Sequence, residues 1–140
     1  MRAILITAAV AGAVGFVAGN AFWYLASPLW IDQVVSEPLV AGAGQTVLKS
    51  GQFQGADAVH KGAGTAELID TGGQTLVRFT GFEVTNGPDL YVWLVKAGNI
   101  ESSSDVKASE WLELGRLKGN IGDQNYVLPE GASAGDYGSV

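Results

Sequence analysis

A long uncharged stretch near the amino terminus limits most strongly how this chain can fold. Positions 3–31 contain no Asp, Glu, Lys or Arg, and a helix that spans a bilayer needs about 20 consecutive apolar residues. Arg2 precedes the stretch, and Trp23, Tyr24 and Trp30 lie near its far end, as aromatic residues do at a membrane interface. The pattern predicts a single-pass helix in the lipid bilayer, with the amino terminus inside the cell and the remainder outside.

A cleaved signal peptide is the competing interpretation, because small residues near Gly19 and Ala21 could suit a signal peptidase. The apolar run exceeds an ordinary signal core of about 7–15 residues, which favours an uncleaved signal-anchor. Gly15 and Gly19 also form a small-xxx-small pair that would let two helices approach closely. Chance explains most such pairs, because glycine is common in membrane helices. The pair is therefore compatible with a helix dimer and does not require one.

The charge outside this stretch argues against two classes of partner. Beyond position 31 the chain has seven Lys and Arg and fourteen Asp and Glu, which gives a net charge of −7. Nucleic acid and anionic lipid headgroups are bound by clustered basic residues, so neither is expected as a partner. The chain has no cysteine, so it contains neither a disulfide nor a thiolate metal site.

Three regions are expected along the chain. Residues 1–31 form the anchor, and Pro28 should end its helix. Residues 32–49 form a linker that includes the small-residue segment 36–45, a tether between membrane and domain. The folded part should begin near Thr46, and the β domain proper covers residues 50–140.

The β domain is predicted from short segments rich in β-branched and aromatic residues, separated by Gly, Asn, Asp and Pro turns. The segments are Thr65–Ile69, Thr75–Val84, Leu90–Lys96, Trp111–Leu117 and Asn125–Pro129. One helical turn is expected within residues 102–111, with Ser102 or Ser103 as its cap. The fold class predicted is all-β, an antiparallel sandwich or barrel-like domain.

Alternation along Thr75–Val84 predicts which side chains share a face of the sheet. Leu76, Arg78, Thr80 and Phe82 should point one way, and Val77, Phe79 and Gly81 the other. Both faces of this strand would then be partly apolar.

Few residues suggest catalysis. His60 is the only histidine, and a metal site generally takes three or four ligands, so a structural hydrogen bond from a loop is the expected role. No serine lies in a pattern typical of a hydrolytic nucleophile. The segment Gly62–Glu67 begins like a dinucleotide loop, but it lacks the third glycine and indicates a strand entrance with close backbone packing. Carboxylates such as Glu110 and Glu113 are spaced like solvated residues, and Trp93 and Trp111 sit within strand patterns.

Two polar stretches stand out. Asn86, Gly87, Pro88 and Asp89 form a turn before a strand, and residues 119–126 place amides and an aspartate around two glycines. Side chains of these types commonly satisfy backbone groups in rigid turns. Ligand binding is the alternative role.

These segments resemble the DM13 domain in its bacterial, membrane-anchored form. The resemblance covers residues 50–140 and is carried by "SGQFQGADAVHKGAGTAEL", "LVRFTGFEVTNGPDLYVWL" and "LGRLKGNIGDQNYVLP". It implies a β-rich extracytoplasmic domain with a proposed role in electron transfer. The positions that match the family's motifs are His60, Asn86, Gly87, Pro88, Asp89, Asn120, Gly122, Gln124, Asn125 and Tyr126.

The resemblance also implies a difference at the carboxyl end. Members of the family continue past the equivalent of "DYGSV" into an apolar strand that carries a cysteine, and this cysteine is the basis for proposing a thiol role or a prosthetic group such as haem. We therefore expect the sequence to be a fragment, truncated before the last strands. In this sequence, no residue can be named as a redox centre, and any cofactor is unknown.

Two functions follow as hypotheses. The first is a membrane-tethered electron-transfer module with an envelope redox partner. The alternative is a non-catalytic cell-envelope module that binds a protein or ligand through its Gly/Asn-rich turns, since binding surfaces often lie in such loops.

Overall fold

The computed structural model describes residues 1–39 and 44–140. The chain divides into two compact units, Met1–Ile31 together with Asn86–Pro88, and Asp32–Thr85 together with Asp89–Val140.

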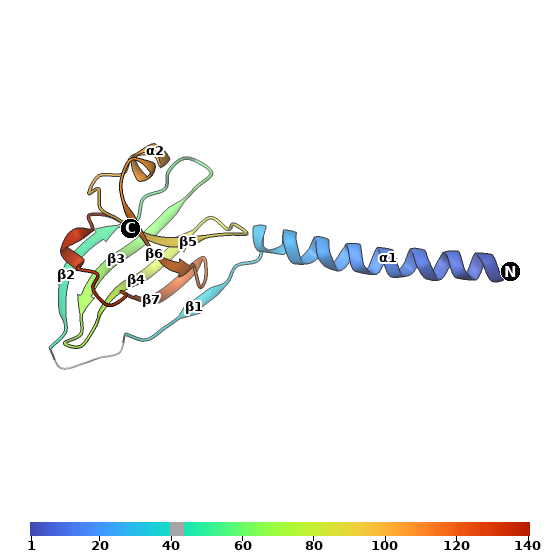
Figure 1. Cartoon of the computed structure of the whole chain (residues 1–140), viewed down its shortest axis with the longest axis horizontal. Helices are drawn as coiled ribbons and strands as arrows, with labels where there is room; N and C mark the ends of the chain where they lie inside the picture. Colours follow the sequence, from blue (N-terminus) through green and yellow to red (C-terminus); the bar gives the residue numbers. More distant parts are fainter. Residues whose placement is uncertain (40–43) are drawn as a thin grey trace. The chain divides into compact units, whose positions relative to one another are not determined.

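The first unit contains the apolar helix α1, which spans Arg2–Ala26 (Figure 1). The helix is long and apolar enough to cross a membrane, although a signal sequence would pass the same test. It ends two residues before Pro28, as expected, and a short 3-10 helix, η1, follows over Ser27–Leu29. The indole rings of Trp23 and Trp30 pack edge to face with centroids 6.0 Å apart.

The second unit is a sandwich-like arrangement of two sheets. A five-stranded sheet has the order β1-β7-β4-β3-β2, and β5 and β6 form a two-stranded sheet. The elements are β1 Val34–Ser36, β2 Thr46–Gln52, β3 Gly62–Asp70, β4 Thr75–Val84, β5 Tyr91–Val95, α2 Ser103–Lys107, β6 Trp111–Arg116, β7 Ile121–Val127 and the 3-10 helix η2 Ala134–Asp136. All strand pairs are antiparallel except β1 with β7. The predicted all-β class is confirmed, and the larger sheet is mixed.

The core lies between the two sheets. Val77 and Phe79 of β4 and Val92 and Leu94 of β5 belong to one buried cluster. Phe82 joins this cluster and stacks on Phe79 with centroids 4.8 Å apart. The predicted placement of Phe82 beside Arg78 was therefore wrong. A bulge between Phe79 and Phe82 adds a residue to β4 and reverses the alternation after it.

Two strands differ from the sequence expectation. β7 begins at Ile121, four residues before the predicted start, because the segment interpreted as a turn pairs with β4. β2 was not predicted, since its polar sequence TVLKSGQ lacks a clear apolar alternation, and all seven of its residues are exposed. The predicted helical turn is present as α2, which follows Ser102 at its N-cap.

Part of the predicted linker folds onto the domain. Val34–Ser36 form β1 and pair in parallel with Ile121–Asp123 of β7. Gly122 has φ +104°, and a Cβ there would overlap the carbonyl oxygen of Val35, so only glycine allows β1 to approach this closely. Residues 40–43, within the predicted tether, lie outside the described residues.

Candidate functional site

A cavity of about 770 Å³ opens between the two sheets of the second unit. Its floor is apolar and includes Leu68 of β3, Val77 of β4 and Leu94 of β5. Residues 49–56, 98–103 and 137–140 form most of the remaining wall, which carries amide, hydroxyl and carboxylate groups. An apolar floor with a polar rim at this volume is typical of a site for a small organic molecule.

The cavity offers few side chains that could hold a metal. None of its lining residues is His, Cys or Met. Lys49, another lining residue, donates through Nζ to the carbonyl oxygens of Gly135, at 3.2 Å, and Tyr137, at 2.6 Å. The Tyr137 ring packs against the core cluster. Within residues 1–39 and 44–140, no three His, Asp or Glu side chains gather as a metal ion requires.

His60 lies in the loop between β2 and β3, outside the cavity lining. Its Nδ1 is 2.7 Å from Asp57 Oδ2, and its backbone N–H donates to Asp57 Oδ1. The backbone and side-chain hydrogen bonds of His60 and the N–H of Val59 lower the pKa of Asp57 to about 2. The histidine side chain is 72% exposed, so the expected structural hydrogen bond is present on the surface. The glycine-rich strand entrance that follows is also as predicted, because a Cβ at Gly64 would lie 2.7 Å from the Cα of Phe82.

The motif around β7 supplies an internal hydrogen-bond network. Gln124 is fully buried, and its side-chain amide pairs with both backbone groups of Gly119. Tyr126 donates its hydroxyl to Gln124 Oε1 at 2.7 Å and accepts from the Lys118 N–H at 3.0 Å. Burial raises the pKa of the Tyr126 phenol above its ordinary value. These side chains hold the β6–β7 connection in place.

Asn120 extends this network toward the segment that precedes β1. Its Oδ1 accepts from the Gln33 N–H at 2.6 Å, and its Nδ2 donates to Asp32 Oδ1 at 2.9 Å. The side chain is buried. Together with Gly122, it fixes where the chain enters the domain.

A buried arginine occupies the opposite face of the large sheet from the core. Arg78 is 7% exposed and donates to Asp123 Oδ2 at 2.6 Å, to Asn125 Oδ1 at 3.0 Å and to the Glu37 carbonyl at 2.7 Å. Lys118 Nζ bonds both carboxylate oxygens of Glu37. Asn125, one of the motif residues, therefore belongs to an ionic network that ties residue 37 to β4 and β7.

The Glu37 carboxylate is stabilised by this network. Burial raises its pKa, but hydrogen bonds from Lys118 and the Asn125 N–H, with the charges of Lys118 and Arg78, outweigh burial and lower the pKa below its ordinary 4.5. The sequence predicted that Glu37 lies in a tether, because the small and polar residues around it are typical of a linker and give no sign of this network.

Asp89 directs its carboxylate toward the outer side of the small sheet. Its Oδ1 accepts from Arg116 Nη2 at 2.6 Å, and both side chains are mostly exposed. Arg116 lies over the Tyr91 ring, 5.4 Å from its centroid. Asn86, Gly87 and Pro88 belong to the first unit, so the structure divides the predicted turn between the two units.

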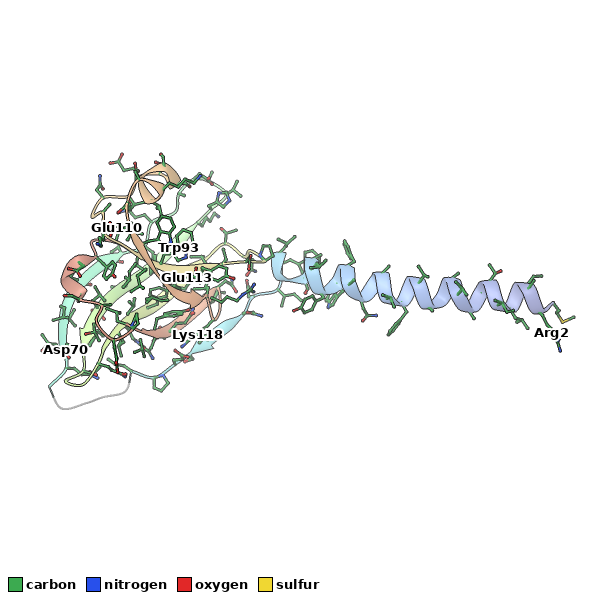
Figure 2. The ribbon with its side chains drawn as sticks, viewed as in Figure 1. Arg2, Asp70, Trp93, Glu110, Glu113 and Lys118 are labelled. Atoms are coloured by element: carbon green, nitrogen blue, oxygen red, sulfur yellow. The ribbon has the colours of Figure 1, made fainter. Side chains whose placement is uncertain are left out.

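Beside this pair, two tryptophans stack. The rings of Trp93 and Trp111 have centroids 5.2 Å apart and an interplanar angle of 20°, and Trp93 Nε1 donates to Glu113 Oε2 at 3.2 Å. Figure 2 shows Trp93 and Glu113 close together. The sequence indicated sheet-face or core positions for both tryptophans, and the structure places them on the outer face of β5 and β6.

Comparison with known proteins gives one positive result. A family model described as "Electron transfer DM13" matches residues 52–140. No curated protein and no solved structure matches the chain. The matched residues include β3 to β7, the cavity floor and the Trp93–Trp111 pair.

Proposed function

Because the chain belongs to the DM13 family of electron-transfer domains, we propose that it is a membrane-tethered module that passes electrons outside the cytoplasm. The family match over residues 52–140 is the observation that carries this function. The apolar helix α1 supports the tether, and the single charge of Arg2 before it supports an inside amino terminus.

Haem does not fit the side chains that line the cavity. The lining of the cavity lacks His, Cys and Met, which with Tyr are the usual axial ligands of haem iron. Tyr137 lines the cavity, but it packs against the core cluster, and His60 lies outside the lining.

A planar organic redox group, such as a quinone or a flavin, binds without axial ligands from side chains. The apolar floor formed by Leu68, Val77 and Leu94 suits an aromatic ring system, and the polar rim suits its carbonyl groups. We assign the cavity as the site for a group of this class.

The test uses the full chain purified in a mild detergent. We expect an absorbance band in the near-ultraviolet or visible range that is bleached reversibly by a reductant, together with a small organic molecule released on denaturation and identified by mass spectrometry. A colourless protein that takes up no electrons, even after addition of a naphthoquinone or riboflavin phosphate, would contradict the proposal.

A matched pair of variants localises the group. Val106→Trp adds bulk at a half-buried residue of the lining and should abolish the chromophore, whereas Lys107→Trp adds the same ring at an exposed neighbour outside the lining and should retain it. Membranes from cells that express the full chain test the anchor. An uncleaved α1 leaves the domain in the pellet after alkaline carbonate extraction and accessible to protease from outside.

A binding module without redox chemistry is the second candidate. The exposure of His60 and Asp89, whose side chains are 72% and 63% exposed, favours it, because both could contact a partner. Asp89→Ala should then reduce the capture of envelope proteins by cross-linking. Asn125→Ala, which alters the internal network, is the matched change at a less exposed motif residue.

A further inference from the structure

The sequence of β5 is that of a strand covered on both faces. In YVWLV, Val92 and Leu94 point into the core, and Tyr91 and Trp93 point outward. An antiparallel strand with one solvated face ordinarily alternates apolar with polar residues, and a continuous apolar run is typical of a strand buried on both sides. Tyr91 and Trp93 nevertheless remain 41% and 37% exposed.

Four outward side chains of the paired strands β5 and β6 make up what we call the aromatic face: Tyr91, Trp93, Trp111 and Arg116. Trp111 is 47% exposed and stacks on Trp93, while Arg116 lies over Tyr91. Trp, Tyr and Arg are the residue types that contribute most binding energy at protein interfaces. The stacked rings are already held in position, so binding would order few side chains.

The charges around the aromatic face indicate the chemistry of what covers it. Asp89 pairs with Arg116, and Glu110 pairs with Lys96 at 2.5 Å. Glu113 accepts a hydrogen bond from the uncharged Trp93. The two ion pairs cancel, so the carboxylate of Glu113 gives the rim one net negative charge. The region beyond position 31 has seven basic and fourteen acidic residues, a net charge of −7, so its field attracts a positively charged surface.

We propose that the aromatic face is the docking surface for an electron-transfer protein that presents a basic patch. This inference rests on the proposed function. Leu94 lines the cavity from one side of β5, and Trp93, the preceding residue, lies on the other side. Since neighbouring residues of a strand point to opposite faces, a partner on the aromatic face lies one strand's thickness from the cavity.

The test measures binding to a defined basic probe. The full chain is held in nanodiscs of neutral phosphatidylcholine, one copy per disc, and titrated with a small basic c-type cytochrome. We expect a Kd in about the micromolar range, as for small transient redox interfaces, weakening as salt is added. The same cytochrome with acetylated lysines should bind at least about tenfold more weakly, because the complementary charge is removed.

Two sets of variants test the surface. Trp93→Ala with Trp111→Ala should weaken binding about tenfold or more, and Trp93→Phe with Trp111→Phe should restore much of it. Val47→Ala with Leu48→Ala, at apolar positions of β2 that are 52% and 46% exposed, should leave the Kd unchanged. Circular dichroism spectra like that of the wild type, with melting temperatures well above the temperature of the titration, exclude unfolding as the cause.

The outcomes separate the docking surface from the function. An unchanged Kd in the double alanine variant, equal binding of the acetylated cytochrome, or binding of the aromatic face to the lipid itself would overturn the docking proposal. Binding that depends on the aromatic face without electron exchange, followed by absorbance of the reduced cytochrome, would uphold the docking surface and contradict electron transfer. Electron exchange that is unchanged in the tryptophan variants would uphold electron transfer and contradict the docking surface.

Discussion

The outward faces of the two sheets differ: the large sheet buries a charged side chain, and the small sheet exposes aromatic side chains. On the large sheet, a charged residue, Arg78, is 7% exposed. On the small sheet, Tyr91, Trp93 and Trp111 are between 37% and 47% exposed. The difference shows that a side chain is buried when another part of the chain covers its face of the sheet, whatever its own polarity.

Coverage on the large sheet comes from the chain itself. β1 pairs with β7. Glu37, the residue after β1, provides the carbonyl that accepts from Arg78 and the carboxylate that accepts from Lys118. A buried charge is tolerated only when it is paired and hydrogen-bonded. On the small sheet, the described residues place no comparable strand over the tryptophans, and we infer a partner there.

The largest expected effect is the loss of Arg78. Arg78→Met leaves Asp123 without its cation, and the unfolding free energy should fall by about 3 kcal/mol, the low end of the cost of breaking a buried ion pair. Asp123 is one-third exposed, which limits the loss. Urea unfolding of the full chain in detergent measures it.

Arg116→Met is the matched change on the small sheet. Because both members of the Arg116–Asp89 pair are mostly exposed, its cost should stay below about 1 kcal/mol. Equal losses for the two arginines would show that the faces do not differ in this way.

An effect smaller than that of Arg78→Met, but larger than that of Arg116→Met, is expected at Gly122. Gly122→Ala forces a side chain into a positive-φ position against the Val35 backbone, which should cost about 2 kcal/mol and release β1. Hydrogen exchange at Val34–Ser36 should rise sharply, while exchange in β5 stays as in the wild type. Protection that persists in β1 would argue against glycine as the requirement for this pairing.

Acid should weaken the network around Glu37 on the large sheet. The folded-state pKa of Glu37 is lowered, so its stabilising contribution is present above the ordinary value of 4.5 and is lost as the pH falls through the lower folded-state value. Unfolding free energies measured from neutral to acid pH should decline less steeply in Lys118→Met, which removes a hydrogen-bonding partner of Glu37. Lys107→Met, at a lysine outside this network, should retain the wild-type slope.

A small effect on stability, like that of Arg116→Met, is expected at the tryptophans of the aromatic face. Trp111→Ala removes one half-exposed aromatic stack and should cost about 1 kcal/mol, even though it weakens partner binding. Thermal melting of the full chain checks this value. A loss as large as that of Arg78→Met would mean that Trp111 serves the fold more than a partner.

Much of the architecture could be predicted from local pattern. The helix α1, the strand β4 with its exact bounds and the helical turn α2 follow from uncharged length, β-branched alternation and a capping serine. β2 was missed because its sequence has no apolar period, and it is held by pairing with β3. Phe82 was placed on the wrong face because a bulge is a property of two paired strands and has no clear signal in one.

The residues that match the family's motifs fall into two groups, internal and exposed, which the sequence did not distinguish. Their residue types suggested rigid turns or binding, and the sequence left both open. Gln124 and Tyr126 acquire internal partners only when residues 118 and 119 fold back on β7, whereas His60 and Asp89 remain at the surface. A binding role for these positions stays a prediction.

By itself, the sequence determined the apolar helix, the β class and the acidic balance, because each depends on composition or short-range periodicity. Only the tertiary structure decided that Glu37 belongs to the domain, that Arg78 is buried and paired, and that Trp93 and Trp111 share an outer face. These features join residues far apart in the chain, and long-range contacts depend on strand order and register, which no local pattern specifies.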